Sequence, residues 1–109
     1  MNIEEVRDYC LSKEETTESL PFGDDTLVFK VRGKMFALAN LDGPLNLSLK
    51  CDPELAIELR ENYEVVTPGY HMNKKHWNTV KIDNSLPDML IMEWIDHSYD
   101  LVKRSVKKR

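Results

Sequence analysis

Alternation of side chains, strict in residues 45–50, is the feature that most constrains the fold of this chain. Residues 26–31 (TLVFKV) and residues 45–50 (LNLSLK) carry an apolar side chain at every second position. A period of two residues is typical of a strand with one buried face. Residues 35–39 (MFALA) lie between them, after a turn around Gly33 and before the LDGP segment. These features predict an antiparallel meander of three strands with one face toward water.

Three helices are predicted around these strands. Asn2, with Glu5 three residues later, forms a capping-box pattern, and the first helix is expected to end near Lys13. Asp52 stands before a proline, which favours the start of a second helix at that point. The NSLPD segment opens a third helix, whose apolar stripe runs on toward the basic end of the chain.

Two short strands complete the predicted sheet. Residues 63–68 (YEVVTP) and residues 77–82 (WNTVKI) both have strand-like composition and follow the second helix. The expected fold is therefore a two-layer α+β domain of order α-β-β-β-α-β-β-α, with the helices on one face of an antiparallel sheet. At 109 residues, the whole chain (1–109) is expected to form this one domain.

Composition and charge limit the classes of function. The chain has a net charge of −4, with 19 acidic and 15 basic residues, and five of the basic ones stand in the terminal VKRSVKKR. Such an acidic body repels nucleic acid at long range, so any contact with DNA would need a local patch. No apolar run is long enough to span a membrane, and the N-terminus does not look like a signal peptide. Cys10 and Cys51 are expected to be reduced core residues, and a monomeric cytoplasmic protein is expected.

The stretch PGYHMNKKHWNTV, residues 68–80, gathers rings and lysines into one turn-like segment. One interpretation is an anion-binding loop in which lysine and histidine contact phosphate and aromatic faces stack on bases. The other interpretation is a tight hairpin, in which Trp77 fills the edge of the core, Asn73 takes a left-handed turn position, and the lysines are simply hydrated. The candidate nucleic-acid contacts of this loop and of the first hairpin are Tyr70, His71, Lys74, Lys75, His76, Lys30, Arg32 and Lys34.

Catalytic and metal chemistry have weaker support in the sequence. His71 and His76 are spaced for neither a helix face nor alternate strand positions, and the third ligand would have to be His97. No Ser or Cys nucleophile motif accompanies these histidines, and the four glycines are isolated turn residues. The expectation is a protein that is not an enzyme and has no catalytic residue, metal or cofactor.

Four segments carry a resemblance to a known family. The stretches LPFGDDTLVFKVRGKMFALANL, CDPELAIELRENY, PGYHMNKKHWNTV and SYDLVKRS together resemble the MmcQ/YjbR family of small bacterial proteins. The resemblance implies a fold like that of the frataxin homologue CyaY or of small secretion chaperones. It also implies a DNA-binding role, because members are commonly labelled so, with the sheet and its loops proposed to act as wings. A similar fold does not fix a function.

Two functional hypotheses follow. The first is a DNA-binding module of low sequence specificity that uses the loop and the hairpin as phosphate contacts. The second is a protein-binding adaptor or chaperone-like domain that uses the exposed face or edge of the sheet. A steep loss of affinity with salt is typical of the first, whereas an apolar interface depends on salt much less.

Overall fold

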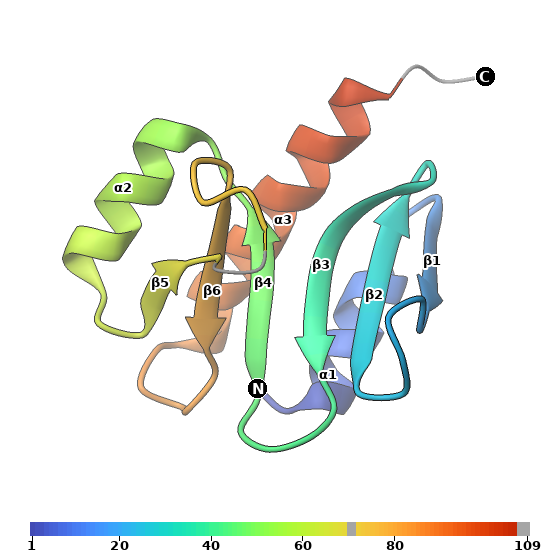
Figure 1. The fold of residues 1–109 in the computed structure, drawn as a ribbon, viewed down its shortest axis with the longest axis horizontal. Helices are drawn as coiled ribbons and strands as arrows, with labels where there is room; N and C mark the ends of the chain where they lie inside the picture. The colour runs from blue at the N-terminus through green and yellow to red at the C-terminus, as the bar shows by residue number, and fades with distance from the viewer. Residues whose placement is uncertain (70–71, 107–109) are drawn as a thin grey trace.

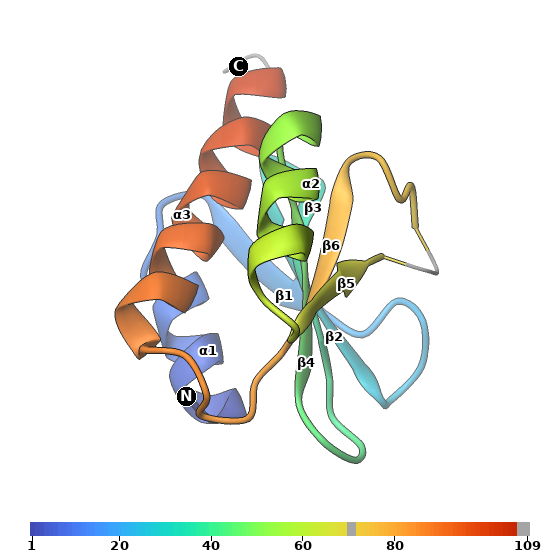
Figure 2. The same cartoon turned by 90° about the vertical axis from the view of Figure 1, so that its left-hand side faces the viewer.

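The computed structural model describes residues 1–69 and 72–106, which form an antiparallel sheet covered on one face by helices (Figure 1). The strands are ordered β1-β2-β3-β4-β6-β5 across the sheet, and all neighbours are antiparallel. Figure 2 shows the helices on one side of the sheet, as predicted. The elements along the chain are α1 (Ile3–Leu11), β1 (Thr16–Ser19), β2 (Thr26–Val31), β3 (Lys34–Asn40), β4 (Asn46–Lys50), α2 (Pro53–Asn62), β5 (Val66–Pro68), β6 (Trp77–Lys81) and α3 (Asp88–Ser105).

The predicted fold class is confirmed, but the predicted order lacks one strand, β1. Its sequence, TTES, has no apolar residue, so neither alternation nor composition signals a strand there. The strand forms because its backbone pairs with the outer edge of β2, from Thr16 opposite Val31 to Ser19 opposite Val28. The observed order is α-β-β-β-β-α-β-β-α.

The helix starts follow the predicted caps. Asn2 Oδ1 accepts a hydrogen bond from the Glu5 N–H at 2.8 Å, and Glu5 Oε1 accepts one from the Asn2 N–H at 3.1 Å, which completes the capping box. Asp52 Oδ2 accepts from the Leu55 N–H at the start of α2. The first helix ends at Leu11, slightly earlier than expected, and α3 ends at Ser105. The last residues of the basic tail, 107–109, lie outside the described residues.

The core lies between the sheet and the helices. Leucine, phenylalanine and valine side chains from alternate positions of β2 and β4 meet the buried stripe of α3, as the alternation predicted. Phe36 from β3 packs edge-on against Tyr99 of α3, with ring centroids 5.3 Å apart. The largest fully buried apolar side chains of this layer are Phe29, Phe36, Leu47, Ile95, Val6, Val31, Val80 and Val102.

A β-bulge in β3 changes the direction of its side chains. Lys30 pairs with Met35 but Phe29 pairs with Ala37, so Phe36 is an extra residue in the ladder. Phe36 and Ala37 both belong to the core as a result. A bulge also bends its strand, and the β3–β4 pairing covers just three residue pairs, the last being Ala37 with Leu49. Figure 1 shows β3 curving away from β4 beyond that point.

Ser98 of α3 bridges the two strands where they separate. Its hydroxyl is fully buried, donates to the Phe36 carbonyl at 2.5 Å, and accepts from the Lys50 N–H at 2.9 Å. Both backbone groups would otherwise be buried without a partner, and an unpaired buried group costs about 1–3 kcal/mol. The polar Ser98 on the apolar stripe of α3 therefore provides hydrogen bonds for the two backbone groups at which β3 and β4 separate.

Arg32 fixes the turn between β2 and β3 to the end of α3. Arg32 and Gly33 both have positive φ angles, 52° and 84°, as a two-residue hairpin turn of type I′ requires. The Arg32 guanidinium donates to Glu15 Oε2 at 2.7 Å and to the carbonyls of Lys103 and Val106 at 3.1 and 3.0 Å. These contacts offset the strain of a non-glycine residue in the left-handed region and cap α3.

We predict that Ser98→Ala destabilises the fold by about 2–3 kcal/mol, because it leaves both the Phe36 carbonyl and the Lys50 N–H unpaired. Ser105→Ala is the matched control on the same helix, since the Ser105 hydroxyl bonds locally to the Val102 carbonyl. The control is expected to change stability by less than about 0.5 kcal/mol. Urea denaturation measures both values, and an equal effect of the two variants would contradict the bridging role.

We predict that Arg32→Ala lowers the free energy of unfolding by about 1–2 kcal/mol, after allowance for its partly exposed partner Glu15. Alanine keeps a Cβ at the same positive φ, so the change isolates the guanidinium contacts. Lys34→Ala, two residues away and exposed, is expected to stay within about 0.5 kcal/mol of the parent. Thermal denaturation of both variants tests this prediction. An Arg32→Ala variant as stable as the parent would contradict it.

Candidate functional site

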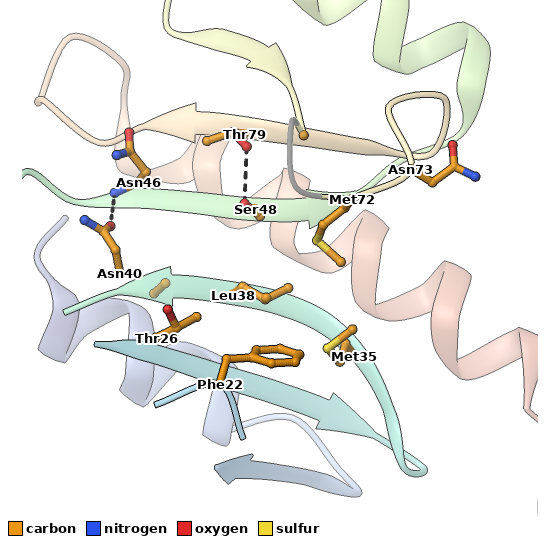
Figure 3. A pocket seen from close by; sticks show the side chains of 12 residues that line it. Phe22, Thr26, Met35, Leu38, Asn40, Asn46, Ser48, Met72, Asn73 and Thr79 are labelled. Carbon is orange, nitrogen blue, oxygen red and sulfur yellow. Dashed lines mark hydrogen bonds between the residues drawn. The ribbon is translucent and has the colours of Figure 1, made fainter. Parts of the chain in front are cut away.

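The open face of the sheet, opposite the helices, carries a groove of about 750 Å³ (Figure 3). Strands β2, β3, β4 and β6 form its floor, and Figure 2 shows residues 20–25 and 72–76 projecting from this side of the sheet as its walls. Its volume is in the usual range of ligand-binding clefts. The lining residues are Phe22, Thr26, Met35, Leu38, Ala39, Asn40, Asn46, Ser48, Gly69, Met72, Asn73 and Thr79.

The groove owes its apolar character to the bulge and to the two walls. Because Phe36 is the extra residue, Met35 and Leu38 both lie on the open face, Leu38 at the middle of the groove and Met35 at one end. Phe22 comes from the loop before β2, and its side chain is 62% exposed beside this floor. Met72 faces it from the opposite wall (Figure 3). An exposed ring and three further apolar side chains thus line one concavity.

The polar side chains of the groove divide into two kinds. The Asn40 amide is committed to the turn before β4, since Nδ2 donates to the carbonyls of Asp42 and Pro44 and Oδ1 accepts from the Asn46 N–H. Ser48 and Thr79 instead pair their hydroxyls across β4 and β6 at 3.2 Å. One hydroxyl uses its hydrogen for this mutual bond. The hydrogen of the other hydroxyl and the remaining lone pairs can still bind a ligand. None of the lining residues in the described part of the chain is ionisable.

The loop from Gly69 to Trp77 has a rigidly packed base. A Cβ at position 69 would come within 2.9 Å of the Trp77 Cβ, so only glycine fits there without a shift. The Asn73 carbonyl accepts from the N–H groups of His76 and Trp77, and its side chain accepts from the Lys75 N–H. Asn73 therefore makes the turn through its side chain and not through the left-handed conformation that the hairpin interpretation expected. Trp77 is 7% exposed, which confirms the prediction that it is largely buried.

Among the predicted phosphate contacts that the structure describes, Arg32 does not share a patch with Lys74 and Lys75. Lys74 and Lys75 are exposed in the loop, and His76 is half-buried behind them. Arg32 is held by Glu15 and by the end of α3, on the helix side of the molecule, while residues 72–76 project from the open face (Figure 2). Lys34 is exposed beside that turn and Lys30 is half-buried on β2. Tyr70 and His71 lie outside the described residues.

The cysteines are poor candidates for nucleophiles. Both are free and buried, as expected. Burial raises the pKa of Cys10 to about 12 and, with the nearby Asp52 carboxylate, the pKa of Cys51 to about 11. Each thiol is therefore protonated at neutral pH and is not in its reactive thiolate form.

The other polar groups on the helix side have structural partners. His97 Nε2 accepts from the Asp52 N–H at 3.2 Å, and the Tyr9 hydroxyl donates to Asp96 at 2.6 Å. Burial and this contact with Asp96 raise the pKa of Tyr9 to about 12. Within residues 1–69 and 72–106, no three His, Cys, Asp or Glu side chains come together as a metal site. Because His71 is outside that part, the absence of a metal stays a prediction.

Asn78 has the one side-chain atom in the described part that is buried without a hydrogen bond. Its Nδ2 donates to the Ala56 carbonyl at 3.2 Å, while its Oδ1 has no partner. A void of about 10 Å³ under α2 is lined by Asn78. One water molecule needs about that much space, so the void suits a structural water and not a larger ligand.

No helix of the described chain is long and apolar enough to cross a membrane.

Known proteins are similar to this chain in sequence and in fold. The family model YjbR matches residues 11–101. Uncharacterized protein YjbR of Escherichia coli K12 is 38% identical over 100 residues, covering 91% of this chain and 85% of the relative. Uncharacterized protein YbdF of Escherichia coli O157:H7 is 39% identical over 90 residues, covering 82% of this chain and 74% of the relative.

Two solved structures agree with these relatives. The crystal structure of Deinococcus radiodurans protein DR2400, described as a DUF419 domain, superposes with a TM-score of 0.92 at 42% identity, over 98% of this chain and 83% of that one. A crystal structure from Pseudomonas syringae gives a TM-score of 0.81 at 31% identity, over 94% and 99%. From the match of the family model and the identity to these relatives, the chain belongs to the YjbR family.

Proposed function

We propose that this chain is a non-catalytic binding domain that holds an apolar segment of a partner protein in the groove on the open face of its sheet. The observation that carries the proposal is the concentration of Phe22, Met35, Leu38 and Met72 around one cavity, whose lining among residues 1–69 and 72–106 includes no ionisable side chain. Exposed apolar side chains that converge on a concavity are typical of an interaction surface. Methionine suits such a surface because its unbranched side chain adapts to different partners.

The face of the sheet is better suited to this role than its edges. A partner that adds a strand needs a long, flat edge with unpaired backbone groups. One edge strand, β5, has three residues and ends in Pro68, which has no N–H to donate. The other, β1, has four polar residues, and Glu18 on it is held by Arg7 at 2.7 Å. Of the two surfaces expected for an adaptor, the structure therefore favours the face.

DNA binding is the second candidate function. It is supported by Lys74 and Lys75, exposed on a wall of the groove, together with the exposed ring of Phe22, on which a base could stack. Against it stand the net charge of −4 and the commitment of Arg32 to α3. The described lining of the floor has no charged side chain to pair with phosphate, and its hydroxyls offer neutral hydrogen bonds alone. For these reasons we propose DNA binding second, after binding of a protein segment.

The test is an NMR titration of the ¹⁵N-labelled chain with a peptide whose core is Leu-Phe-Leu-Met between neutral Gly-Ser flanks. We expect amide shifts at Leu38, Ser48 and Thr79, because an apolar core would lie on this floor. Ser48→Phe should abolish these shifts, since a phenyl ring on β4 would project from the floor and block the apolar core of the peptide. Ile57→Gln, which removes an exposed apolar side chain from α2 on the helix side, is the matched control and should leave them unchanged.

Two outcomes would contradict the proposal. One is a peptide titration that shifts no groove amide, or that shifts the same amides in Ser48→Phe. The other is tight, salt-dependent binding of duplex or single-stranded DNA that is lost in Lys74→Ala/Lys75→Ala, together with no response to the peptide. The second result would place DNA binding first.

A further inference from the structure

The two ends of the groove carry opposite charge, although none of the described residues that line it is charged. In Figure 3, Thr26, Asn40 and Asn46 lie at one end, and Met35 and Asn73 lie at the other. Charged residues flank these lining residues directly in the sequence and in the ladders. We call the two ends the aspartate end and the lysine end.

The aspartate end is formed by two turns that touch. The Asp25 carbonyl accepts from the Leu41 N–H at 2.7 Å, which brings Asp24 and Asp25 beside the turn that contains Asp42. The three aspartates are exposed. Lys81 is paired opposite Asn46 and offsets one of their charges, so this end keeps a net negative charge.

The lysine end lies beyond Met35 and Asn73. Lys74 and Lys75 follow Asn73 directly and are exposed. Lys30 pairs opposite Met35, and because it alternates with Phe29 of the core it lies on the groove side of β2. Acidic residues are absent from the described parts of the loop, 69 and 72–76. This end is therefore positive, in a chain that is acidic as a whole.

We propose that the groove selects a segment with an apolar centre and charge separated along its length, acidic residues lying at the lysine end and basic residues at the aspartate end. This inference rests on the proposed function and adds the chemistry of the partner. Complementary charge at the rim of an interface guides the encounter and fixes the register more than it adds affinity. Several lysines at one end suit an acidic run better than a single carboxylate.

The size of the groove limits the apolar centre. The five residue steps along β3 from Asn40 to Met35 span about 15 Å at the usual rise of a strand. An extended segment covers that distance with about four or five residues. The partner segment is thus short: a few apolar residues between an acidic and a basic flank.

The test compares three peptides with one core, Leu-Phe-Leu-Met. The first has Glu-Glu before the core and Lys-Lys after it, the second has Glu-Lys on both sides, and the third has neutral Gly-Ser flanks. The first two have equal composition and net charge and differ in charge separation alone. At low salt we expect the first to bind about fivefold more tightly than the second, and the difference to vanish at about 0.5 M NaCl.

Variants assign the effect to the lysine end. Lys74→Gln/Lys75→Gln should remove most of the preference for separated charge while the neutral peptide still shifts Leu38, Ser48 and Thr79. Arg60→Gln/Arg104→Gln removes the same charge from α2 and α3 and should keep the preference. Equal binding of the first two peptides, with the neutral peptide still in the groove, overturns this inference alone. If none of the peptides binds, the proposed function fails with it.

Discussion

The bridge from Ser98 to the Phe36 carbonyl and the Lys50 N–H is the interaction on which the shape of this molecule depends. A bulge in β3 bends the strand away from β4, and the separation would expose two backbone groups to an apolar core. The Ser98 hydroxyl serves both, because it can donate and accept at once. The bend is thereby stable, and the same bulge turns Met35 and Leu38 toward the open face. Structural support on one side of the sheet thus shapes the groove on the other.

How far the sequence predicts this fold depends on where the determining contacts lie. The alternation in β2 and β4 and the caps at Asn2 and Asp52 depend on residues that are close in the chain. They can therefore be predicted from the sequence. The bulge is not, because MFALA reads as a regular strand until the ladder with β2 shows that Phe36 is unpaired. Strand β1 is hidden for a related reason, since its polar residues pair only because β2 offers a free edge. Ser98 on an apolar stripe marks the place of the bulge only in hindsight.

The candidate site was harder to predict than the fold. Sequence reasoning selected groups that carry charge or a ring and stand together in the chain, and it therefore selected the loop around Lys74 and the hairpin around Arg32. The groove collects Phe22, Met35, Leu38 and Met72 from three separate segments, and each residue is unremarkable among its own neighbours. Arg32 is the opposite case. In the sequence it looks like a free cation in a turn, but its guanidinium is hydrogen-bonded to the end of α3. The adaptor hypothesis named the exposed face of the sheet, but no residue pattern marked its lining.

The described residues of the loop from Gly69 to Trp77 have structural roles, to which the proposed function adds a binding role. Trp77 is buried and Gly69 packs against it so closely that a larger residue would not fit, so these two hold the base of the loop on β6. Asn73 then closes the turn with hydrogen bonds to three following N–H groups. A turn held at its base and its bend presents Met72 to the groove and carries Lys74 and Lys75 past its end. In the proposed function, the buried indole fixes this wall, and the wall then offers Met72 as an apolar contact and Lys74 and Lys75 as positive charge to a bound segment.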